Sequence, residues 1–322
     1  MRSKALESAK LSEPAKIGIV GAGLMGHAIA QIFALKGYSV SLFDRDPQVL
    51  QEAPSRIRSN FSTFLDLGLA TLDDVEFCLS HIRLCSTLED AASEASLIIE
   101  AISENLSLKK QVFAELEKYV RPATVLCSNT SAISITLIAE ALERKERLLG
   151  THFWNPPHIV PCVEVIRSSF TSSEVFDFVY ELMRHIGKRP VKVLKDVPGF
   201  LGNRMQHALW REAMSLVQRG IATPEGIDEV VKAGFGLRMP FLGPLETADL
   251  AGLDLSYDIH QDLFPHLEIT TKPLSVLAEK VEQGDLGAKA GHGFHEWPKE
   301  KLEQVVKDRD RFLLRITQLM SG

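Results

Sequence analysis

The chain has 322 residues, 45% of them hydrophobic and 24% charged, and it carries a formal net charge of −6. This length allows two domains, and the composition is typical of a globular protein with a small-molecule substrate. A nucleic acid or an anionic membrane would need a concentrated basic face, so neither is expected as a partner. Residues 1–15 lack the apolar core of a signal peptide, and no apolar run approaches the ~20 residues of a membrane span. We expect these first residues to form a flexible N-terminal tail of a cytoplasmic protein.

The next predicted elements are a strand at 16–20 and a helix at 24–35, joined by a glycine-rich turn. The turn reads Gly21-Ala22-Gly23-Leu24-Met25-Gly26, the G-x-G-x-x-G pattern in the context that binds dinucleotides. The first glycine allows the tight turn, the second lets the backbone approach the pyrophosphate, and the third lets helix and strand pack closely. The residues expected to bind the cofactor here are Gly21, Gly23, Leu24, Met25 and Gly26.

A second predicted strand, at 38–43, ends on Asp44. A carboxylate roughly 20 residues beyond the glycine motif can accept hydrogen bonds from the ribose hydroxyls and would repel a 2′-phosphate. Asp44 therefore favours NAD over NADP. Arg45 follows directly and leaves NADP open as the alternative, because its guanidinium could pair with that phosphate; otherwise it is a solvated loop charge.

Helical patterns at 48–69 and 72–79 make a long excursion over residues 46–80, which we interpret as a substrate-binding arm. Further strands are then predicted, with helices between them, at 82–85, 97–101, 124–127, 148–152, 163–166 and 190–194. This alternation predicts an α/β fold, with a doubly wound parallel sheet of the Rossmann type over residues 16–195.

Strand signals stop beyond residue 197. Apolar residues then recur at helical spacing at 200–217, 224–233, 244–255 and 274–281, and a last helix carries an apolar stripe from Leu302 to Leu319. We expect an all-α domain over 196–322, with that stripe packing on its own core or on another subunit. Ligands of such folds bind at the carboxyl ends of the strands, so the active site is expected in the cleft between the two domains.

The four cysteines, Cys78, Cys85, Cys127 and Cys162, show no C-x-x-C spacing and have apolar neighbours. They are expected to be buried, reduced thiols. No cluster of histidine, cysteine and acidic residues has the spacing of metal ligands, so no metal is expected.

The residues that could carry chemistry lie at the ends of two predicted strands, on the next strand and near the domain boundary. His152 ends a strand, where an imidazole can take the hydroxyl proton of a secondary alcohol at neutral pH. Glu164, on the next strand, either orients this imidazole or points outward from an edge strand. Ser131 and Asn203 offer a hydroxyl and an amide that could polarise the reacting oxygen, although such residues are more often turn or helix-cap residues.

Six segments taken together resemble the 3-hydroxyacyl-CoA dehydrogenase family in order and spacing. They are 100–106 (EAISENL), 128–131 (SNTS), 152–156 (HFWNP), 163–166 (VEVI), 198–204 (PGFLGNR) and 287–294 (GAKAGHGF). The resemblance implies an NAD-dependent oxidoreductase that interconverts an L-3-hydroxy and a 3-keto group, and a homodimer built through the helical domain.

The same resemblance implies roles for individual residues. His152 corresponds to the catalytic base, Glu164 to its carboxylate partner, and Ser131 and Asn203 to the ligands of the substrate oxygen. Glu104 and Lys109 correspond to residues near the cofactor, which Ser131 and Asn155 are also expected to contact. A non-catalytic NAD(H)-binding structural or redox-sensing protein on the same fold is the alternative function.

The substrate is left open between an acyl-CoA and a small polar hydroxy compound. Acyl-CoA enzymes of the family carry a lysine in the segment after the catalytic histidine, where this chain reads NPPHIVP at 155–161, and no lysine lies between Lys36 and Lys109. The double proline, the segment at 239–246 and the helical tail resemble instead the lambda-crystallin (L-gulonate 3-dehydrogenase) branch. L-Gulonate, carnitine and hydroxymethyl-pyridines are candidate substrates.

Overall fold

The computed structural model describes residues 16–320, so the tail expected at 1–15 lies outside the described part. The chain divides into two compact units, one ending at Arg204 and one beginning at Met205. Residues 196–204, which the sequence pattern assigns to the helical domain, lie in the first unit.

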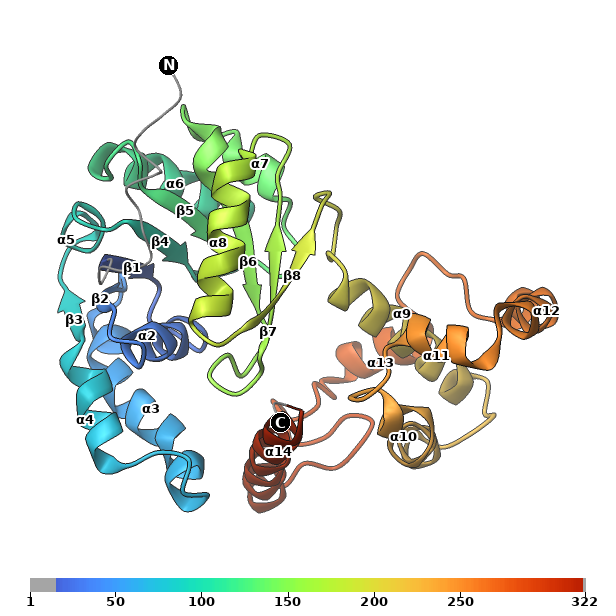
Figure 1. Cartoon of the computed structure of the whole chain (residues 1–322). Coiled ribbons are helices and arrows are strands. Elements are labelled where there is room, and N and C mark those ends of the chain that lie inside the picture. The colour runs from blue at the N-terminus through green and yellow to red at the C-terminus, as the bar shows by residue number, and fades with distance from the viewer. Residues whose placement is uncertain (1–15, 321–322) are drawn as a thin grey trace. The chain divides into compact units, whose positions relative to one another are not determined.

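One eight-stranded sheet forms the centre of the first unit, in the order β3-β2-β1-β4-β5-β6-β7-β8 (Figure 1). The strands are β1 (Lys16–Val20), β2 (Ser39–Phe43), β3 (Ile82–Cys85), β4 (Leu97–Glu100), β5 (Val125–Ser128), β6 (Leu148–Phe153), β7 (Cys162–Ile166) and β8 (Arg189–Val193). The order from β3 to β6 is that of dinucleotide-binding sheets, in which the strand order reverses beside β1. The predicted doubly wound sheet is confirmed.

One strand pair departs from the parallel sheet, because β6 and β7 are antiparallel. A parallel connection needs a crossover of a dozen or more residues, and the segment 154–161 between these strands is too short for one. The chain therefore turns back on itself and places His152 directly opposite Glu164. β8 pairs with β7 in parallel, so β7 is not an edge strand.

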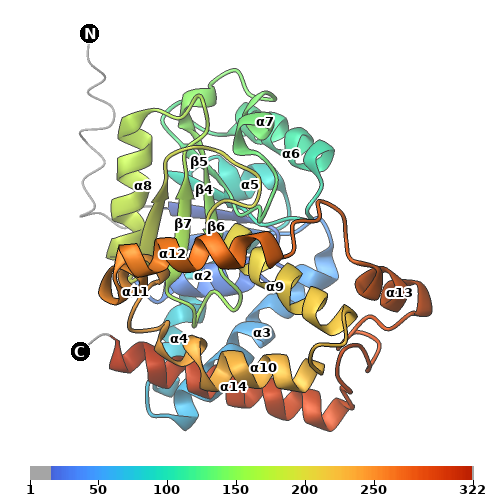
Figure 2. The ribbon, with the colours of Figure 1, turned by 90° about the vertical axis from the view of Figure 1, so that its right-hand side faces the viewer.

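Helices cover both faces of the sheet, as Figures 1 and 2 show. One face carries α2 (Gly26–Ala34), α3 (Pro47–Asp66), α4 (Leu72–Ser80) and α8 (Ser173–His185), and the other carries α5 (Leu88–Ala92), α6 (Leu106–Tyr119) and α7 (Ile135–Ala139). The helical pattern thus produces two apolar cores, one on each side of the strands. These helices pack on the two faces of the sheet and not on the carboxyl ends of its parallel strands, where ligands of such folds bind.

The predicted arm consists of α3 and α4. Its first helix begins where the Asp46 side chain accepts the N–H of Gln48 and Pro47 occupies the first turn. Its apolar face packs on α2 through Ala53, Ile57 and Phe61. The arm is therefore fixed to the nucleotide-binding helix within the same unit.

The second unit contains the rest of α9 (Gly202–Gln218), followed by α10 (Pro224–Ala233), α11 (Pro244–Ala251), α12 (Leu253–Leu263), α13 (Ser275–Gln283) and α14 (Lys299–Leu319). The single helix expected at 244–255 is wrong: the backbone of Gly252 has φ +100°, which ends α11 and starts α12 in a new direction. Over residues 16–320, no helix is both long and apolar enough to cross a membrane.

All four cysteines are free thiols, with Cys78, Cys85 and Cys127 buried and Cys162 only half-buried. Burial raises the pKa of the Cys78 thiol to about 12. Buried thiols with a raised pKa are poor nucleophiles. The expectation that all four cysteines are buried is right for Cys78, Cys85 and Cys127 and wrong for Cys162.

Candidate active site

The glycine-rich turn leaves space where a dinucleotide would lie. Gly21 has φ +102°, and a Cβ on Gly26 would come within 1.7 Å of the Gly21 carbonyl oxygen, so the close packing of helix and strand requires glycine at both positions. A Cβ on Gly23 would meet no atom within 4 Å. The middle glycine thus faces open space at the start of α2, the position where the backbone approaches a pyrophosphate.

A cavity of about 580 Å³ adjoins this turn. Among its lining residues are Gly21, Gly23, Leu24, Met25, Asp44 and Arg45. The Asp44 carboxylate is held at the wall, because Oδ2 accepts the N–H of Ala22 at 2.7 Å and Oδ1 accepts that of Asp46 at 2.9 Å. Size, glycines and carboxylate fit the adenosine and pyrophosphate of NAD. The expected ligands Glu104, Lys109, Ser131 and Asn155 are not among the lining residues of this cavity.

A second set of expected site residues, apart from the glycine-rich turn, is centred on the pair of His152 and Glu164. Nδ1 of His152 lies 2.8 Å from Oε2 of Glu164, and the two residues are only 5% and 2% exposed. Burial alone would raise the pKa of the Glu164 carboxyl, but hydrogen bonds from His152 and from two backbone N–H groups outweigh it and hold the pKa below its usual range. Glu164 is thus a buried carboxylate and not an outward-pointing residue of an edge strand.

Oε1 of the same carboxylate accepts the N–H groups of Leu201 and Gly202, at 2.9 and 3.0 Å. These residues form the start of α9, so Glu164 fixes the imidazole and the beginning of this helix together. Phe200, just before them, is fully buried and has φ 49°. Its ring centroid lies 5.9 Å from that of His152.

Ser131 and Asn203 are neighbours, because Nδ2 of Asn203 donates to the Ser131 carbonyl oxygen at 2.8 Å. Oε1 of Glu104 accepts the N–H groups of Ser131 and Ala132, at 2.9 and 3.1 Å, and the hydroxyl of Thr130. These bonds outweigh burial and keep the pKa of the Glu104 carboxyl below its usual range. Glu104 therefore orders the turn that presents Ser131.

Lys109 is 1% exposed and lies between two carboxylates. Its Nζ donates to Oε1 of Glu100 at 2.6 Å and lies 3.4 Å from Oε2 of Glu104. The fully buried Glu100 also accepts the hydroxyl of Ser128 and the N–H of Ile102. Glu100 was not predicted from the sequence as a site residue. Its carboxylate ends the apolar strand LIIE, and a charge in that position indicates that the side chain is buried against a cation.

Trp154 lies beside the imidazole, with ring centroids 5.3 Å apart. A Cβ on Gly202 would come within 2.1 Å of the indole, so the glycine allows this ring to lie against the start of α9. Asn155, expected to contact the cofactor, is exposed and follows Trp154 directly. The imidazole thus has two aromatic neighbours, Trp154 and Phe200.

The arm carries few cations that could bind phosphates. Residues 47–80 contain two arginines and five acidic residues, a net charge of −3. Both arginines are paired with carboxylates, Arg56 with Glu52 at 2.6 Å and Arg58 with Glu76 at 2.8 Å. The electrostatic surface of the arm is therefore unfavourable for a polyanionic substrate.

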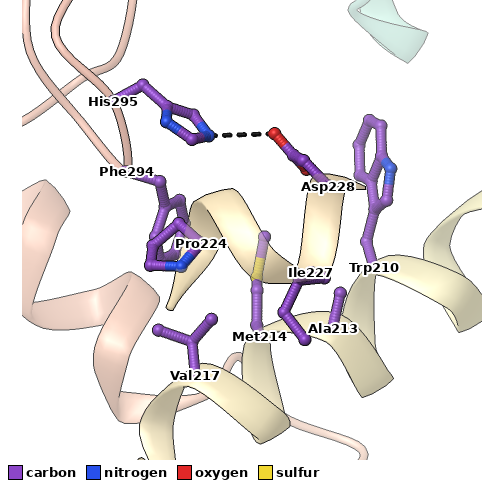
Figure 3. Close-up of a pocket in the computed structure, with 9 residues that line it drawn as sticks. All are labelled: Trp210, Ala213, Met214, Val217, Pro224, Ile227, Asp228, Phe294 and His295. Carbon is purple, nitrogen blue, oxygen red and sulfur yellow. Dashed lines mark hydrogen bonds and ion pairs between the residues drawn. The ribbon is translucent and has the colours of Figure 1, made fainter. Parts of the chain in front are cut away.

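Figure 3 shows a second cavity, of about 320 Å³, inside the helical unit. Its walls are apolar, formed by residues such as Trp210, Met214 and Phe294, and Asp228 accepts a hydrogen bond from His295 at 3.0 Å at its edge. No group of three or more histidine, cysteine or acidic residues in the part of the chain that is described could hold a metal ion.

Two family models match consecutive parts of the chain. Residues 16–197 match the 3-hydroxyacyl-CoA dehydrogenase, NAD binding domain, and residues 199–297 match the 3-hydroxyacyl-CoA dehydrogenase, C-terminal domain. The final helix α14 lies beyond both.

Relatives with two kinds of substrate in their names are similar over most of the chain. A 5-formyl-3-hydroxy-2-methylpyridine 4-carboxylate 5-dehydrogenase of Mesorhizobium japonicum is 34% identical over 307 residues, which is 95% of this chain and 98% of that protein. A probable 3-hydroxybutyryl-CoA dehydrogenase of Bacillus subtilis is 38% identical over 283 residues, 88% of this chain and 97% of that protein.

Solved structures of both kinds share the fold. A crystal structure of a 5-formyl-3-hydroxy-2-methylpyridine 4-carboxylic acid 5-dehydrogenase, an NAD+-dependent dismutase, has a TM-score of 0.89 and 32% identity, covering 96% of this chain and 99% of that one. The (S)-3-hydroxybutyryl-CoA dehydrogenase of Ralstonia eutropha has a TM-score of 0.75 and 33% identity, covering 89% and 100%.

Proposed function

Because this chain belongs to the 3-hydroxyacyl-CoA dehydrogenase family of NAD-dependent oxidoreductases, we propose that His152 is the general base of its alcohol oxidation. The buried pair of His152 and Glu164 is the observation that carries this proposal. With Nδ1 held by the carboxylate, Nε2 is the nitrogen that takes the hydroxyl proton. NAD, when bound, accepts the hydride from the carbon that bears this hydroxyl.

The neighbouring polar groups bind and orient the reacting oxygen in this proposal. The Ser131 hydroxyl and the Asn203 amide donate to it, while Glu104 fixes the turn that carries Ser131. Lys109 acts through Glu104 and Glu100, since it is buried between them. Asn155 is exposed next to Trp154, and we assign it to the nicotinamide end of the cofactor.

For the substrate, we propose a small polar hydroxy compound in preference to a CoA thioester. Coenzyme A carries several phosphate charges, each of which normally meets a lysine or arginine at about 1.5–3 kcal/mol per charge-assisted hydrogen bond. Here both arginines of the arm are paired with its own carboxylates, and the arm has a net charge of −3. Arg83, a further arginine of this region, already donates to the hydroxyl of Ser41 and to the carbonyl of Asp90.

Structural similarity and coverage support the same choice, whereas sequence identity does not separate the two kinds of relative. The pyridine-carboxylate dehydrogenase matches 96% of this chain with a TM-score of 0.89, against 89% and 0.75 for the hydroxybutyryl-CoA enzyme. A hydroxymethyl-pyridine is thus one candidate, along with L-gulonate and carnitine.

The experiment that tests this proposal measures NADH formation from a panel of substrates in one buffer. The panel contains L-3-hydroxybutyryl-CoA, free L-3-hydroxybutyrate, L-gulonate, L-carnitine and a hydroxymethyl-pyridine carboxylate. We expect one of the free compounds to have the highest kcat/KM. A CoA thioester that exceeds all of them tenfold or more would overturn the substrate assignment and leave the reaction intact. No NADH from any compound would favour the non-catalytic alternative.

We propose further that two copies associate through the helical unit. Many large apolar side chains of this unit are exposed, among them Phe241 (87%), Leu245 (80%) and Leu250 (77%). Large exposed apolar side chains in such number are typical of a surface that is covered by a partner. A cytoplasmic location is proposed from the four free thiols, since oxidising compartments favour disulfides.

A further inference from the structure

The segment between the strands of His152 and Glu164 reaches from the imidazole to the arm. At its beginning Trp154 lies beside His152, with ring centroids 5.3 Å apart. Four residues later, the His158 ring lies 6.1 Å from that of Phe64 on α3. We call residues 154–161 the β6–β7 loop. Any substrate whose hydroxyl reaches His152 lies near the start of this loop.

Two backbone hydrogen bonds close a turn in the middle of the β6–β7 loop. The N–H groups of Ile159 and Val160 both donate to the Pro156 carbonyl, at 3.1 and 2.9 Å. The carbonyls of Pro157 and Val160 instead accept from outside the loop, and both accept from the same atom, Nζ of Lys188. One side chain thus ties together two points of the loop.

Lys188 lies in the turn between α8 and β8 and is itself well anchored. Its N–H donates to the Met183 carbonyl at 2.9 Å, and the next residue, Arg189, donates to the Pro161 carbonyl at 2.8 Å. The backbone around Lys188 is therefore part of the sheet edge and the end of α8. It provides a fixed base from which the ammonium reaches the loop.

The ammonium of Lys188 is held by carbonyl oxygens alone. Among the ion pairs within residues 16–320, none includes Lys188, whereas the nearby Lys192 pairs with Asp177 at 2.6 Å. Burial lowers the pKa of the Lys188 ammonium to about 8. Lys188 is half-buried, and even partial burial of a cation without a carboxylate partner costs free energy, which its hydrogen bonds to the two carbonyls offset.

We propose that Lys188 is a positioning residue that fixes the β6–β7 loop through the Pro157 and Val160 carbonyls and thereby shapes the substrate side of the active site. It touches neither the reacting atoms nor the cofactor cavity, and it acts through the loop that runs from Trp154 to His158. The proposal rests on the proposed active site, but it does not depend on which substrate is correct.

The test compares Lys188→Met with Lys192→Met. Lys192 lies four residues after Lys188 and is a matched control, because its ammonium is paired with the Asp177 carboxylate. Hydrogen exchange by mass spectrometry requires no substrate. We expect the amides of Ile159 and Val160 to exchange at least about tenfold faster in Lys188→Met and to be unchanged in Lys192→Met. The peptide that contains residues 125–132 should keep its exchange rate in both variants.

Steady-state kinetics with the best substrate of the panel provide the second measurement. We expect KM for that substrate to rise about fivefold or more in Lys188→Met, with KM for NAD within about twofold and kcat within about threefold of wild type. Lys188→Arg, which keeps the donors, should restore at least half of the lost kcat/KM. These effects separate loop positioning from a general loss of structure.

Two results would overturn the proposal. One is unchanged exchange at Ile159 and Val160 together with an unchanged substrate KM in folded Lys188→Met. The other is a parallel loss of NAD binding, kcat and substrate binding, which would indicate a general structural role. If Lys188→Met does not fold, Lys188→Gln, whose shorter side chain cannot reach both carbonyls, must show the same split. If no panel compound is turned over, the function fails while the exchange experiment still decides on Lys188.

Discussion

Glu164 binds His152 with one carboxylate oxygen and the start of α9 with the other. Oε2 lies 2.8 Å from Nδ1 of the imidazole, and Oε1 accepts the N–H groups of Leu201 and Gly202. A single buried carboxylate therefore orients the imidazole and fixes the first residues of α9. Asn203, the next residue of α9, donates from Nδ2 to the Ser131 carbonyl. Substitutions at these residues should separate catalysis from cofactor binding.

We expect the imidazole of His152 to be needed for turnover and not for cofactor binding. His152→Ala should lower kcat by about 10²–10⁴, the usual contribution of a positioned general base, and leave the Kd for NAD nearly unchanged. Cofactor binding is expected to be retained because His152 does not line the cavity beside Gly23 and Asp44. Turnover and NADH fluorescence titration measure the two effects. Wild-type turnover in the folded variant would remove His152 from the mechanism.

Glu164→Gln should reduce kcat by a comparable factor of about 10²–10⁴. An amide can donate to Nδ1 as well as accept from it, so the imidazole would no longer be held with Nε2 free to accept a proton. The amide also meets three donors with one oxygen, and unfolding should become easier by about 1–3 kcal/mol. Glu174→Gln, at an exposed position of α8, is the control. Equal kcat in the two variants would contradict the role of Glu164.

The depressed pKa of Glu164 predicts how stability depends on pH. Hydrogen bonds from His152, Gly202 and Leu201 overcome burial and lower this pKa below its usual value near 4.5. The folded chain then binds fewer protons here than the unfolded chain, so the stabilisation is complete above pH 4.5 and is lost as the pH falls through the folded-state pKa. Urea unfolding at pH 6, 4 and 3 should show a steeper loss of the free energy of unfolding below about pH 4.5 for wild type than for Glu164→Gln. Parallel curves would refute this assignment.

The sheet could be predicted from sequence because its signals are local. Each strand is a short apolar run bounded by turn residues, and the β1–turn–α2 unit carries its glycines in fixed positions. The direction of β7 depends on the length of a connection and not on strand composition, so the pattern alone gave a parallel strand. Gly252 ends a helix through its positive φ, which an apolar pattern running across it conceals.

The site could be predicted in part. Strand ends placed His152 and Glu164 within reach, and the structure brings them together. Glu100 contacts Lys109, nine residues away, and Ser128, 28 residues away, and a lone charge at a strand end gives no sign of which partner it meets. The pairing of the arm arginines with Glu52 and Glu76 is equally invisible without coordinates. Because both pairs are exposed, each contributes little, and the excess of acidic residues decides the charge of the arm.

Asp44→Ala should narrow the preference for NAD over NADP. The carboxylate at the cavity wall is placed to bind the ribose hydroxyls and to repel a 2′-phosphate, so its loss weakens one cofactor and relieves the other. Titration of both cofactors gives the ratio of their Kd values. Arg45→Ala, one residue along the same wall, should move the ratio in the opposite direction or leave it unchanged. An unaltered ratio in Asp44→Ala would assign the selectivity to another residue.

Phe241→Asp and Leu245→Asp should weaken self-association if the helical unit forms the interface. These side chains are 87% and 80% exposed within one chain, and burying each against a second copy would contribute about 1.5–3 kcal/mol. Each is counted twice in a symmetric dimer, so one substitution should raise the dimer Kd by about 10² or more. Sedimentation velocity over a concentration series measures this, with Lys232→Asp, at an exposed charged position of the same unit, as the control. A wild-type protein that sediments as a monomer at all concentrations would contradict the proposed dimer, and equal shifts in the control would assign the effect to charge alone.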